Sequence, residues 1–194
     1  MVRELGFEVV AGVDEAGRGP LAGPVVAAAV VLPWRTRFPG MRDGKLLSKV
    51  QRSRYEERIR GCALAVSVFS VPASEVDAVG LTLAGRQAMA GAVSGLPLRA
   101  QYLLIDAFDL PESALPQMAV VRGDSTCMSI MAAGIVAKVA RDREMVAFDG
   151  VYPGYGFAEH KGYATASHKA ALRALGPSPI HRMSWGPLRE LIAT

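Results

Sequence analysis

Apolar runs separated by polar turns give the chain a clear order of expected elements. Phe7 to Val13 and Val25 to Leu32 flank a loop rich in glycine and proline, and they predict two antiparallel neighbouring strands. A valine-rich run from Ala63 to Val71 predicts a third strand, and shorter runs predict two more at Tyr102 to Asp106 and Met118 to Val121. Three strands followed by strand and helix alternation favour an α/β fold with a mixed five-stranded sheet flanked by helices.

Polar segments between these strands carry the signals of helices. Ser48 to Arg60 is dense in Arg, Glu and Gln, and it predicts a solvent-facing helix with Ser48 as N-cap. Ser74 to Ser94 predicts a second helix with Ser74 as N-cap. The Ala- and Met-rich stretch from Ser125 to Phe148 predicts a third helix whose first half is buried.

The chain changes character near residue 150. Gly150, Pro153, Gly154 and Gly156 break regular structure, and two short helices are expected afterwards, at Ala166 to Leu175 and Trp185 to Ile192. We therefore expect a main domain over residues 1–150 and a small C-terminal helical appendage over residues 151–194.

Composition narrows the class of protein. Of 194 residues, 51% are hydrophobic and 21% are charged, which is typical of a soluble globular chain. No apolar run approaches the roughly 20 residues that a membrane span needs, and no secretory signal is visible, so we expect a cytoplasmic protein. Leu188 to Thr194 shows no clear clamp-binding pattern, and we expect a monomer. Cys62 and Cys127 have no C-x-x-C spacing, which argues against a zinc knuckle, and we expect both to be buried thiols.

The net charge of +4 is unevenly distributed. Nine Lys or Arg residues against three acids lie between Arg35 and Arg60, and five against two follow residue 150. Two basic zones that flank an acidic group would suit a phosphate backbone, although a pair of solvated helix faces explains the same pattern.

Four acids stand where apolar segments end. Asp14 and Glu15 follow the run Val9 to Val13, Asp106 ends a strand, and Asp124 opens the long helix. Clustered carboxylates repel one another, and oxygen ligands without Cys or His favour hard ions such as Mg²⁺ or Mn²⁺. Two such ions roughly 4 Å apart can catalyse phosphodiester hydrolysis. Taken singly, Asp124 could instead be an N-cap and Asp106 a turn residue.

Other chemistry-bearing residues have simpler interpretations. His160, His168 and His181 match no zinc template, so we expect nucleic-acid contacts or core packing. Asp142, between two arginines, is expected to be a salt-bridged helix residue outside the acid cluster.

The segment from Asp14 to Val26, DEAGRGPLAGPVV, resembles the signature of type 2 ribonucleases H, the ribonuclease HII family. The resemblance runs from about Val10 to Pro187, and further blocks agree with it in order and spacing: Asp43 to Ser48, Gly123 to Ser125, Ala137 to Asp142, His160 to His168 and Gly176 to Arg182.

The resemblance implies a ribonuclease H-like fold and assigns residues to roles. The carboxylates that bind two Mg²⁺ or Mn²⁺ ions fall on Asp14, Glu15, Asp106 and Asp124. The motif that senses the 2′-hydroxyl falls on Gly17, Arg18 and Gly19, and the tyrosine that stacks on the neighbouring sugar falls on Tyr163. Candidate phosphate contacts are Lys45, Lys138, Lys161 and Arg182.

The activity implied is endonucleolytic cleavage of the RNA strand of RNA/DNA hybrids, and cleavage 5′ to single ribonucleotides embedded in duplex DNA. It leaves 3′-hydroxyl and 5′-phosphate ends, and serves ribonucleotide excision repair and RNA primer removal. One alternative is a type 3 ribonuclease H, which typically has an extra N-terminal domain for which Asp14 lies too near Met1. Another is a non-catalytic hybrid-binding module, which the intact set of four acids disfavours.

Four positions depart from the family pattern: Gly44, Leu46, Ala107 and Gly134. The first two replace a serine and a lysine, Ala107 replaces a glycine, and Gly134 replaces a serine, which we interpret as a helix-packing change. None of them replaces one of the four acids, so we expect activity to survive.

Overall fold

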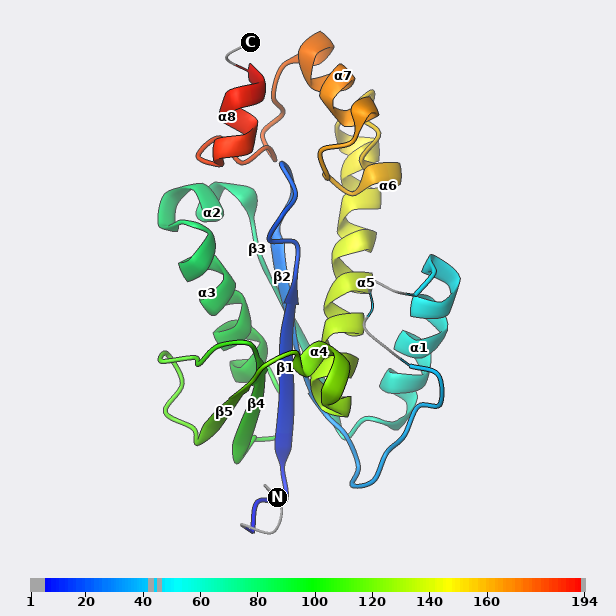
Figure 1. Ribbon diagram of the computed structural model, residues 1–194, viewed down its shortest axis with the longest axis vertical. Coiled ribbons are helices and arrows are strands. Elements are labelled where there is room, and N and C mark those ends of the chain that lie inside the picture. The colour runs from blue at the N-terminus through cyan, green and yellow to red at the C-terminus, as the bar shows by residue number, and fades with distance from the viewer. Residues whose placement is uncertain (1–5, 42–43, 45–46, 193–194) are drawn as a thin grey trace.

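A mixed five-stranded sheet forms the centre of the protein, whose computed structural model describes residues 6–41, 44 and 47–192. The strand order is β3-β2-β1-β4-β5 (Figure 1). β1 pairs with β2 antiparallel and with β4 parallel, so it lies in the middle of the sheet. The predicted fold class is confirmed. The strands are β1 Val10–Ala16, β2 Val25–Val31, β3 Ala65–Val71, β4 Tyr102–Asp106 and β5 Gln117–Val120.

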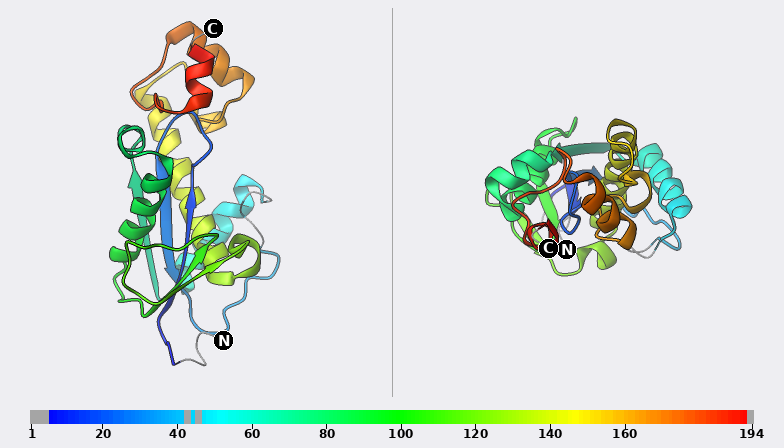
Figure 2. Two further views of the ribbon diagram at one scale, coloured as in Figure 1. Left: turned by 60° about the vertical axis from the view of Figure 1, so that its left-hand side comes forward. Right: turned by 90° about the horizontal axis from the view of Figure 1, so that it is seen from above.

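Helices cover both faces of this sheet. α3 packs on one face against β1, β2 and β3, and α5 packs on the other, with α1 outside it (Figures 1 and 2). α6, α7 and α8 lie together at the end of the molecule where β1 ends and β2 begins. The helices are α1 Lys49–Cys62, α2 Ala73–Val79, α3 Leu81–Ser94, α4 Gly123–Thr126, α5 Met128–Val151, α6 Phe157–His160, α7 Ala166–Leu175 and α8 Gly186–Ile192.

β2 is buried along its whole length because it contributes to two cores. Ala27, Ala29 and Val31 pack with residues of α3, whereas Ala28 and Val30 pack with residues of α5 and α1. A strand covered on both faces is expected to be a continuous apolar run, as VVAAAVV is. Each fully buried valine stabilises the fold by about 1.5–3 kcal/mol.

Gly12 brings β1 and α5 into backbone contact. A Cβ at Gly12 would overlap the main chain of Ser129 and Ile130 at the start of α5. The central strand and the longest helix are therefore as close as two backbones can be, which fixes α5 relative to the end of β1.

Several expected elements differ in detail. The helix expected over Ser74 to Ser94 is two helices, because Gly80 has φ +83° and interrupts it, and the residue at the N-cap position is Pro72 rather than Ser74. The helix expected from Ser125 is likewise divided by the extended backbone of Cys127. α1 begins at its expected N-cap Ser48, which forms a capping box with Gln51.

The prediction that both cysteines are buried was wrong. Both thiols are free, but Cys62 is exposed and Cys127 is half-buried. Within the described ranges, no helix has the length and apolar character that crossing a membrane requires.

Candidate active site

The four predicted acids meet at the sheet edge where β1 and β4 end. Asp14 and Glu15 lie inside β1 rather than after it, since the strand continues to Ala16. Val13 pairs with Ile105 in the parallel register, so Asp106 ends its strand beside Asp14. Asp124 lies in α4, and its backbone N–H donates to Asp106 Oδ1 at 3.2 Å. Residues far apart in the chain are thus brought together by the topology.

Burial and mutual repulsion act on the Asp14 carboxyl. The side chain is 7% exposed, and desolvation raises its pKa well above the ordinary value. Glu15, Asp106 and Asp124 each raise that pKa further, while the backbone N–H of Glu15, which donates to Asp14 Oδ1 at 2.7 Å, lowers it. The field at Asp14 therefore favours a cation or a proton.

The negative charge of the Glu15 carboxylate is only partly compensated by neighbouring groups. Burial raises the pKa of its carboxyl, and Arg18, whose Nη1 lies 3.6 Å from Oε1, opposes that rise. The other oxygen, Oε2, is buried and has no hydrogen-bond partner in the part of the chain that the structure describes. A buried carboxylate oxygen left unpaired is costly, and an added cation would satisfy it.

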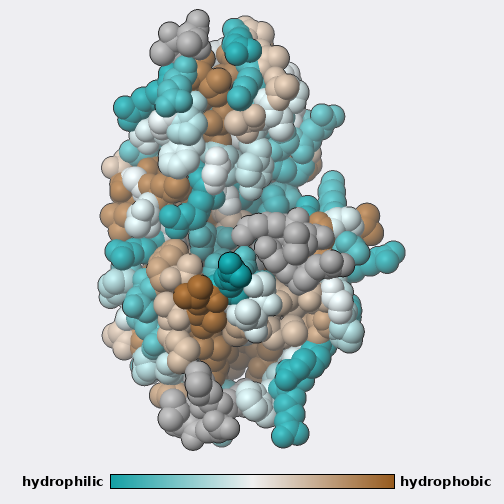
Figure 3. All heavy atoms as spheres, viewed as in Figure 1, coloured by the Kyte–Doolittle hydropathy of each residue, from teal (hydrophilic) through white to brown (hydrophobic). Residues whose placement is uncertain are grey.

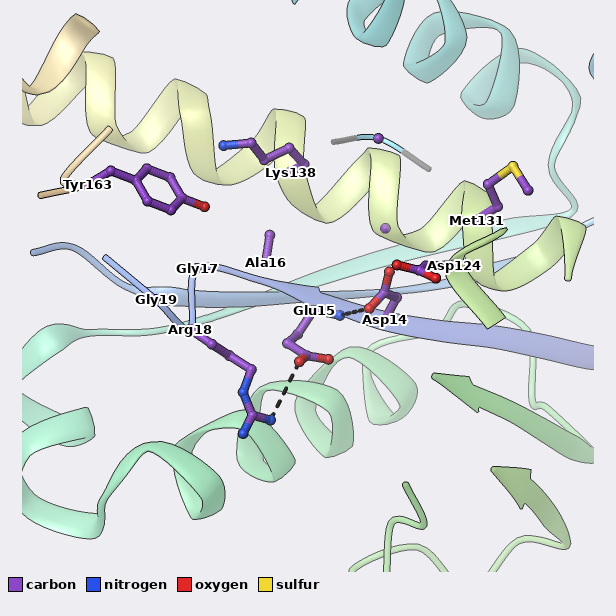
Figure 4. A pocket seen from close by; sticks show the side chains of 12 residues that line it. Asp14, Glu15, Ala16, Gly17, Arg18, Gly19, Asp124, Met131, Lys138 and Tyr163 are labelled. Atoms are coloured by element: carbon purple, nitrogen blue, oxygen red, sulfur yellow. Dashed lines mark hydrogen bonds and ion pairs between the residues drawn. The ribbon is translucent and has the colours of Figure 1, made fainter. Parts of the chain in front are cut away.

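A pocket of about 230 Å³ joins these acids to other predicted site residues. Figure 4 shows Asp14, Glu15 and Asp124 along one part of it, and Lys138 and Tyr163 at the other end. The turn that follows Glu15 also lines it. On the molecular surface, hydrophilic side chains gather between the C-terminal helices and the more hydrophobic lower part of the same face (Figure 3).

The four acids offer the oxygen ligands and the negative charge that a divalent metal prefers, but their side chains are not arranged as a complete coordination site. Across residues 6–41, 44 and 47–192, no group of three or more His, Cys, Asp or Glu side chains is placed to hold a metal ion. Asp14 and Asp106 each accept a backbone N–H of the protein, and Glu15 faces Arg18. The unpaired oxygen of Glu15 and the raised pKa of Asp14 are the features that a bound cation would relieve.

The two glycines of the Gly17-Arg18-Gly19 turn differ in what requires them. Gly17 is buried with φ +97°, and a side chain there would overlap Arg141 and Pro24. Gly19 is exposed, and a Cβ there would meet nothing within 4 Å among the described residues. The fold itself therefore requires glycine at position 17, but not at position 19.

Two buried arginines hold the longer turn from Gly17 to Pro24, which begins with this motif, from the side away from the pocket. Arg141 donates to the carbonyls of Ala22, Pro24 and Lys161 at 2.9–3.0 Å. Arg182, 0% exposed, donates to five carbonyls between Gly17 and Pro24 at 2.5–3.2 Å. We call Arg141 and Arg182 the turn-support pair. Desolvation lowers the pKa of both, that of Arg182 to about 9.

The predicted phosphate contacts lie in different environments. Lys138 lines the pocket, with Nζ 2.6 Å from Asp142 Oδ1 and 5.4 Å from the centroid of the Tyr163 ring. Lys161 is buried, and its Nζ donates to the Ala158 carbonyl. Arg182 is committed to the turn and does not face the pocket, so its assignment as a phosphate contact is corrected. Lys45 lies outside the described residues.

Comparison with known proteins identifies the family. The model of the family described as Ribonuclease HII matches residues 11–187. The chain belongs to the ribonuclease HII family. A ribonuclease HII of Geobacter metallireducens is 51% identical over 193 residues, which are 100% of this chain and 91% of that protein.

Solved structures agree with this ribonuclease HII fold. Ribonuclease H2 of Pyrococcus horikoshii OT3 has a TM-score of 0.80 at 26% identity, covering 95% of this chain and 97% of that one. Bst-RNase HIII in complex with Mn²⁺ has a TM-score of 0.71 at 18% identity, covering 98% and 71%, and supports the fold alone. The chain is a nuclease, and metal binding is typical of its family.

Sequence reasoning missed parts of this ribonuclease HII site. Gly134 of α5 lies against Asp14, since a Cβ there would overlap the carboxylate, so the departure borders an acid rather than a helix contact. Ala107, beside Asp106, has φ +64°, a conformation that glycine adopts more readily. Asp142 is salt-bridged as expected, but to Lys138 and Arg52 rather than to its flanking arginines.

Proposed function

We propose that this ribonuclease HII cuts the RNA strand of RNA/DNA hybrids and cleaves 5′ to single ribonucleotides in duplex DNA. The products have 3′-hydroxyl and 5′-phosphate ends, and the activity serves ribonucleotide excision repair and RNA primer removal. The observation that carries the proposal is the single pocket lined by Asp14, Glu15, Asp124, the Gly17-Arg18-Gly19 turn and Tyr163.

The residues that would hold two Mg²⁺ or Mn²⁺ ions are Asp14, Glu15, Asp106 and Asp124. When bound, such ions supply Lewis acidity toward a phosphate oxygen and lower the pKa of water. Repulsion within the acid cluster and the unpaired Oε2 of Glu15 support this assignment, because both favour added positive charge. Asp106, although outside the pocket lining, is held by the backbone of Asp124.

Selectivity for a ribonucleotide comes from the turn and from Tyr163. The exposed backbone at Gly19 can approach a sugar closely, and the guanidinium of Arg18 lies beside Glu15 at the pocket wall. N–H groups at such a position can donate to a 2′-hydroxyl, and this hydroxyl is what distinguishes RNA from DNA. The Tyr163 ring is 42% exposed and lines the pocket, where it can stack on a sugar.

Basic residues around the pocket contribute contacts to the phosphate backbone of the substrate. Lys138 is the basic residue of the pocket itself, and Lys45 and Lys161 remain predicted contacts from the family resemblance. The helical segment over residues 151–194 is proposed as the substrate-binding appendage, and the protein as a cytoplasmic monomer.

A cleavage assay on a duplex with one embedded ribonucleotide tests the function directly. We expect cleavage 5′ to that ribonucleotide only when Mg²⁺ or Mn²⁺ is present, with a 3′-hydroxyl end that a polymerase extends. Asp106→Asn should abolish cleavage and leave hybrid binding largely intact. Turnover in EDTA, or by the Asp106→Asn variant, would refute the proposed carboxylate role.

The two glycines of the turn provide a matched pair of variants. Gly19→Ala should leave the melting temperature unchanged and weaken discrimination between ribo- and deoxyribonucleotide, because only the substrate requires space there. Gly17→Ala should lower the melting temperature instead, because Arg141 lies behind it. Unaltered discrimination in a folded Gly19→Ala protein would contradict the recognition role of the turn.

A further inference from the structure

Three histidines for which the sequence predicted nucleic-acid contacts or core packing form a buried column behind the pocket. The rings of His160 and His168 stack with centroids 4.2 Å apart and an interplanar angle of 13°. His168 Nε2 lies 3.0 Å from His181 Nε2, and all three side chains are buried. They come from α6, α7 and the segment before α8. We call these residues the histidine column.

The hydrogen bonds around the column determine which ring nitrogen carries each proton. The Tyr163 carbonyl can only accept, so His168 Nδ1, 2.9 Å away, is the donor. The backbone N–H of Ser178 can only donate, so His181 Nδ1, 2.8 Å away, is an acceptor. Neutral His181 then carries its proton on Nε2 and gives it to the bare Nε2 of His168. The bonds therefore run in one direction, from Ser178 to Tyr163.

His160 fixes the adjacent peptide in the same way. Its Nε2 donates to the Tyr155 carbonyl at 2.7 Å, which leaves Nδ1 to accept the backbone N–H of Gly162 at 3.1 Å. The Gly162 carbonyl in turn accepts the N–H of Leu21, inside the turn held by the turn-support pair. The Gly162–Tyr163 backbone is thus anchored by two buried histidines, while the Tyr163 ring projects into the pocket (Figure 4).

We propose that His168, oriented by His181, is a positioning residue that sets the backbone of Tyr163 for substrate binding. The inference rests on the proposed role of Tyr163. It requires the His168–His181 pair to be neutral, because a second proton would place two N–H groups against each other. Burial lowers the pKa of both rings, that of His181 to about 4, and the titratable neighbours facing the pair are His160 and Tyr155.

Ring nitrogen NMR tests the geometry without reference to activity. At pH 7.5 the ¹⁵N shifts should show His168 as the Nδ1–H tautomer, and His160 and His181 as Nε2–H tautomers. His168 as the Nε2–H tautomer, or as a cation, would overturn the inference.

A matched pair of substitutions tests the consequence. In His168→Asn the amide nitrogen takes the place of Nδ1 and keeps the bond to the Tyr163 carbonyl, whereas in His168→Gln the amide oxygen takes the place of the bare Nε2, accepts from His181 and leaves the Tyr163 carbonyl without that donor. We expect His168→Gln to lower kcat/KM on a single embedded ribonucleotide by about tenfold, because misplaced binding groups lose rate. His168→Asn should restore most of that loss, with both melting temperatures recorded.

A background lacking the ring separates positioning from general damage. In Tyr163→Ala protein, His168→Gln should cause no further loss of kcat/KM, since the residue through which it acts is gone. Equal loss in the Asn and Gln variants, or additive loss in the Tyr163→Ala background, would overturn the inference. Full turnover by Tyr163→Ala with the expected tautomers would instead refute the proposed stacking role and leave the backbone anchoring intact.

Discussion

The two sides of the turn from Gly17 to Pro24 hold buried polar groups in opposite conditions. On the pocket side, Asp14 is buried beside three other acids, and Glu15 has an oxygen without a hydrogen-bond partner among the described residues. On the other side, Arg141 and Arg182 are also buried, but they donate to a series of backbone carbonyls. Burial of charge is therefore common to both sides, and only incomplete compensation distinguishes the side that acts on a ligand.

The largest effect is expected on the pocket side. Asp14→Asn should lower cleavage by about 10³-fold or more, because the acid cannot be replaced by a neutral amide in binding cations. The same change should raise the free energy of unfolding by about 1 kcal/mol, since it removes a repelled, desolvated charge. Kinetics and urea unfolding at pH 8 measure the two effects.

Asp142→Asn is the matched control for that variant, because Asp142 is paired with Lys138 at 2.6 Å. It should lose a few tenths of a kcal/mol instead of gaining stability. An Asp14→Asn protein that is less stable than the native one would contradict the claim that the acids repel.

The turn-support pair should respond in the opposite way. Arg182→Met should lower the free energy of unfolding by about 3–5 kcal/mol, because five carbonyls lose the Arg182 donor, although that of Pro24 keeps a bond from Arg141. Arg189→Met, at an exposed arginine that donates to two carbonyls, should cost under about 1 kcal/mol. Comparable stability of the two variants would show that the carbonyl contacts do not hold the turn.

The histidine column predicts a pH dependence of stability. Burial lowers the pKa of His181 from 6.5 to about 4, so between these values the unfolded chain binds a proton that the folded protein does not. The contribution of neutral His181 to the free energy of unfolding is fully present above pH 6.5, and it is lost as the pH falls toward 4, by about 3 kcal/mol in all. Urea unfolding at several pH values between 4.5 and 7.5 should show that the free energy of unfolding depends less on pH in His181→Gln than in the native protein. An unchanged pH dependence would count against the lowered pKa.

The smallest effect concerns the backbone beside Asp106. Ala107 has φ +64°, so Ala107→Gly should raise the free energy of unfolding by up to about 1 kcal/mol. Ala114→Gly in the same loop, where φ is not positive, should lower it by a similar amount or less. Thermal unfolding of the two variants distinguishes relief of strain from a general response to glycine.

Much of the fold could be predicted because each strand was an apolar run with clear limits. The sequence could not reveal that β1 continues through Asp14 and Glu15, since charged residues usually end a strand rather than occupy its last positions. The division of a helix at Gly80 also escaped prediction, because one glycine is tolerated in many helices and only its φ decides.

The structure brings the four predicted acids close together, but it places one predicted cation, Arg182, against backbone carbonyls. All four acids were visible in the sequence because each lies at the end of an apolar segment or at the start of a helix. The family resemblance made Arg182 a candidate phosphate contact, and the sequence could not show its carbonyl partners, which lie about 160 positions away along the chain. The family resemblance located Tyr163, but the histidines that anchor it were visible only as three separate residues.

Gly12 implies a constraint that no catalytic argument would identify. Because α5 rests on the main chain at this position, even a methyl group would push the helix outward, and Lys138 and Arg141 would move with it. A saturation library should therefore contain inactive proteins substituted two residues before Asp14 whose ionisable groups are all intact. Such variants would be inactive because the distance between β1 and α5 has changed. Replacing Ser129 by a residue with a smaller side chain could not restore activity, because the added methyl group overlaps backbone atoms.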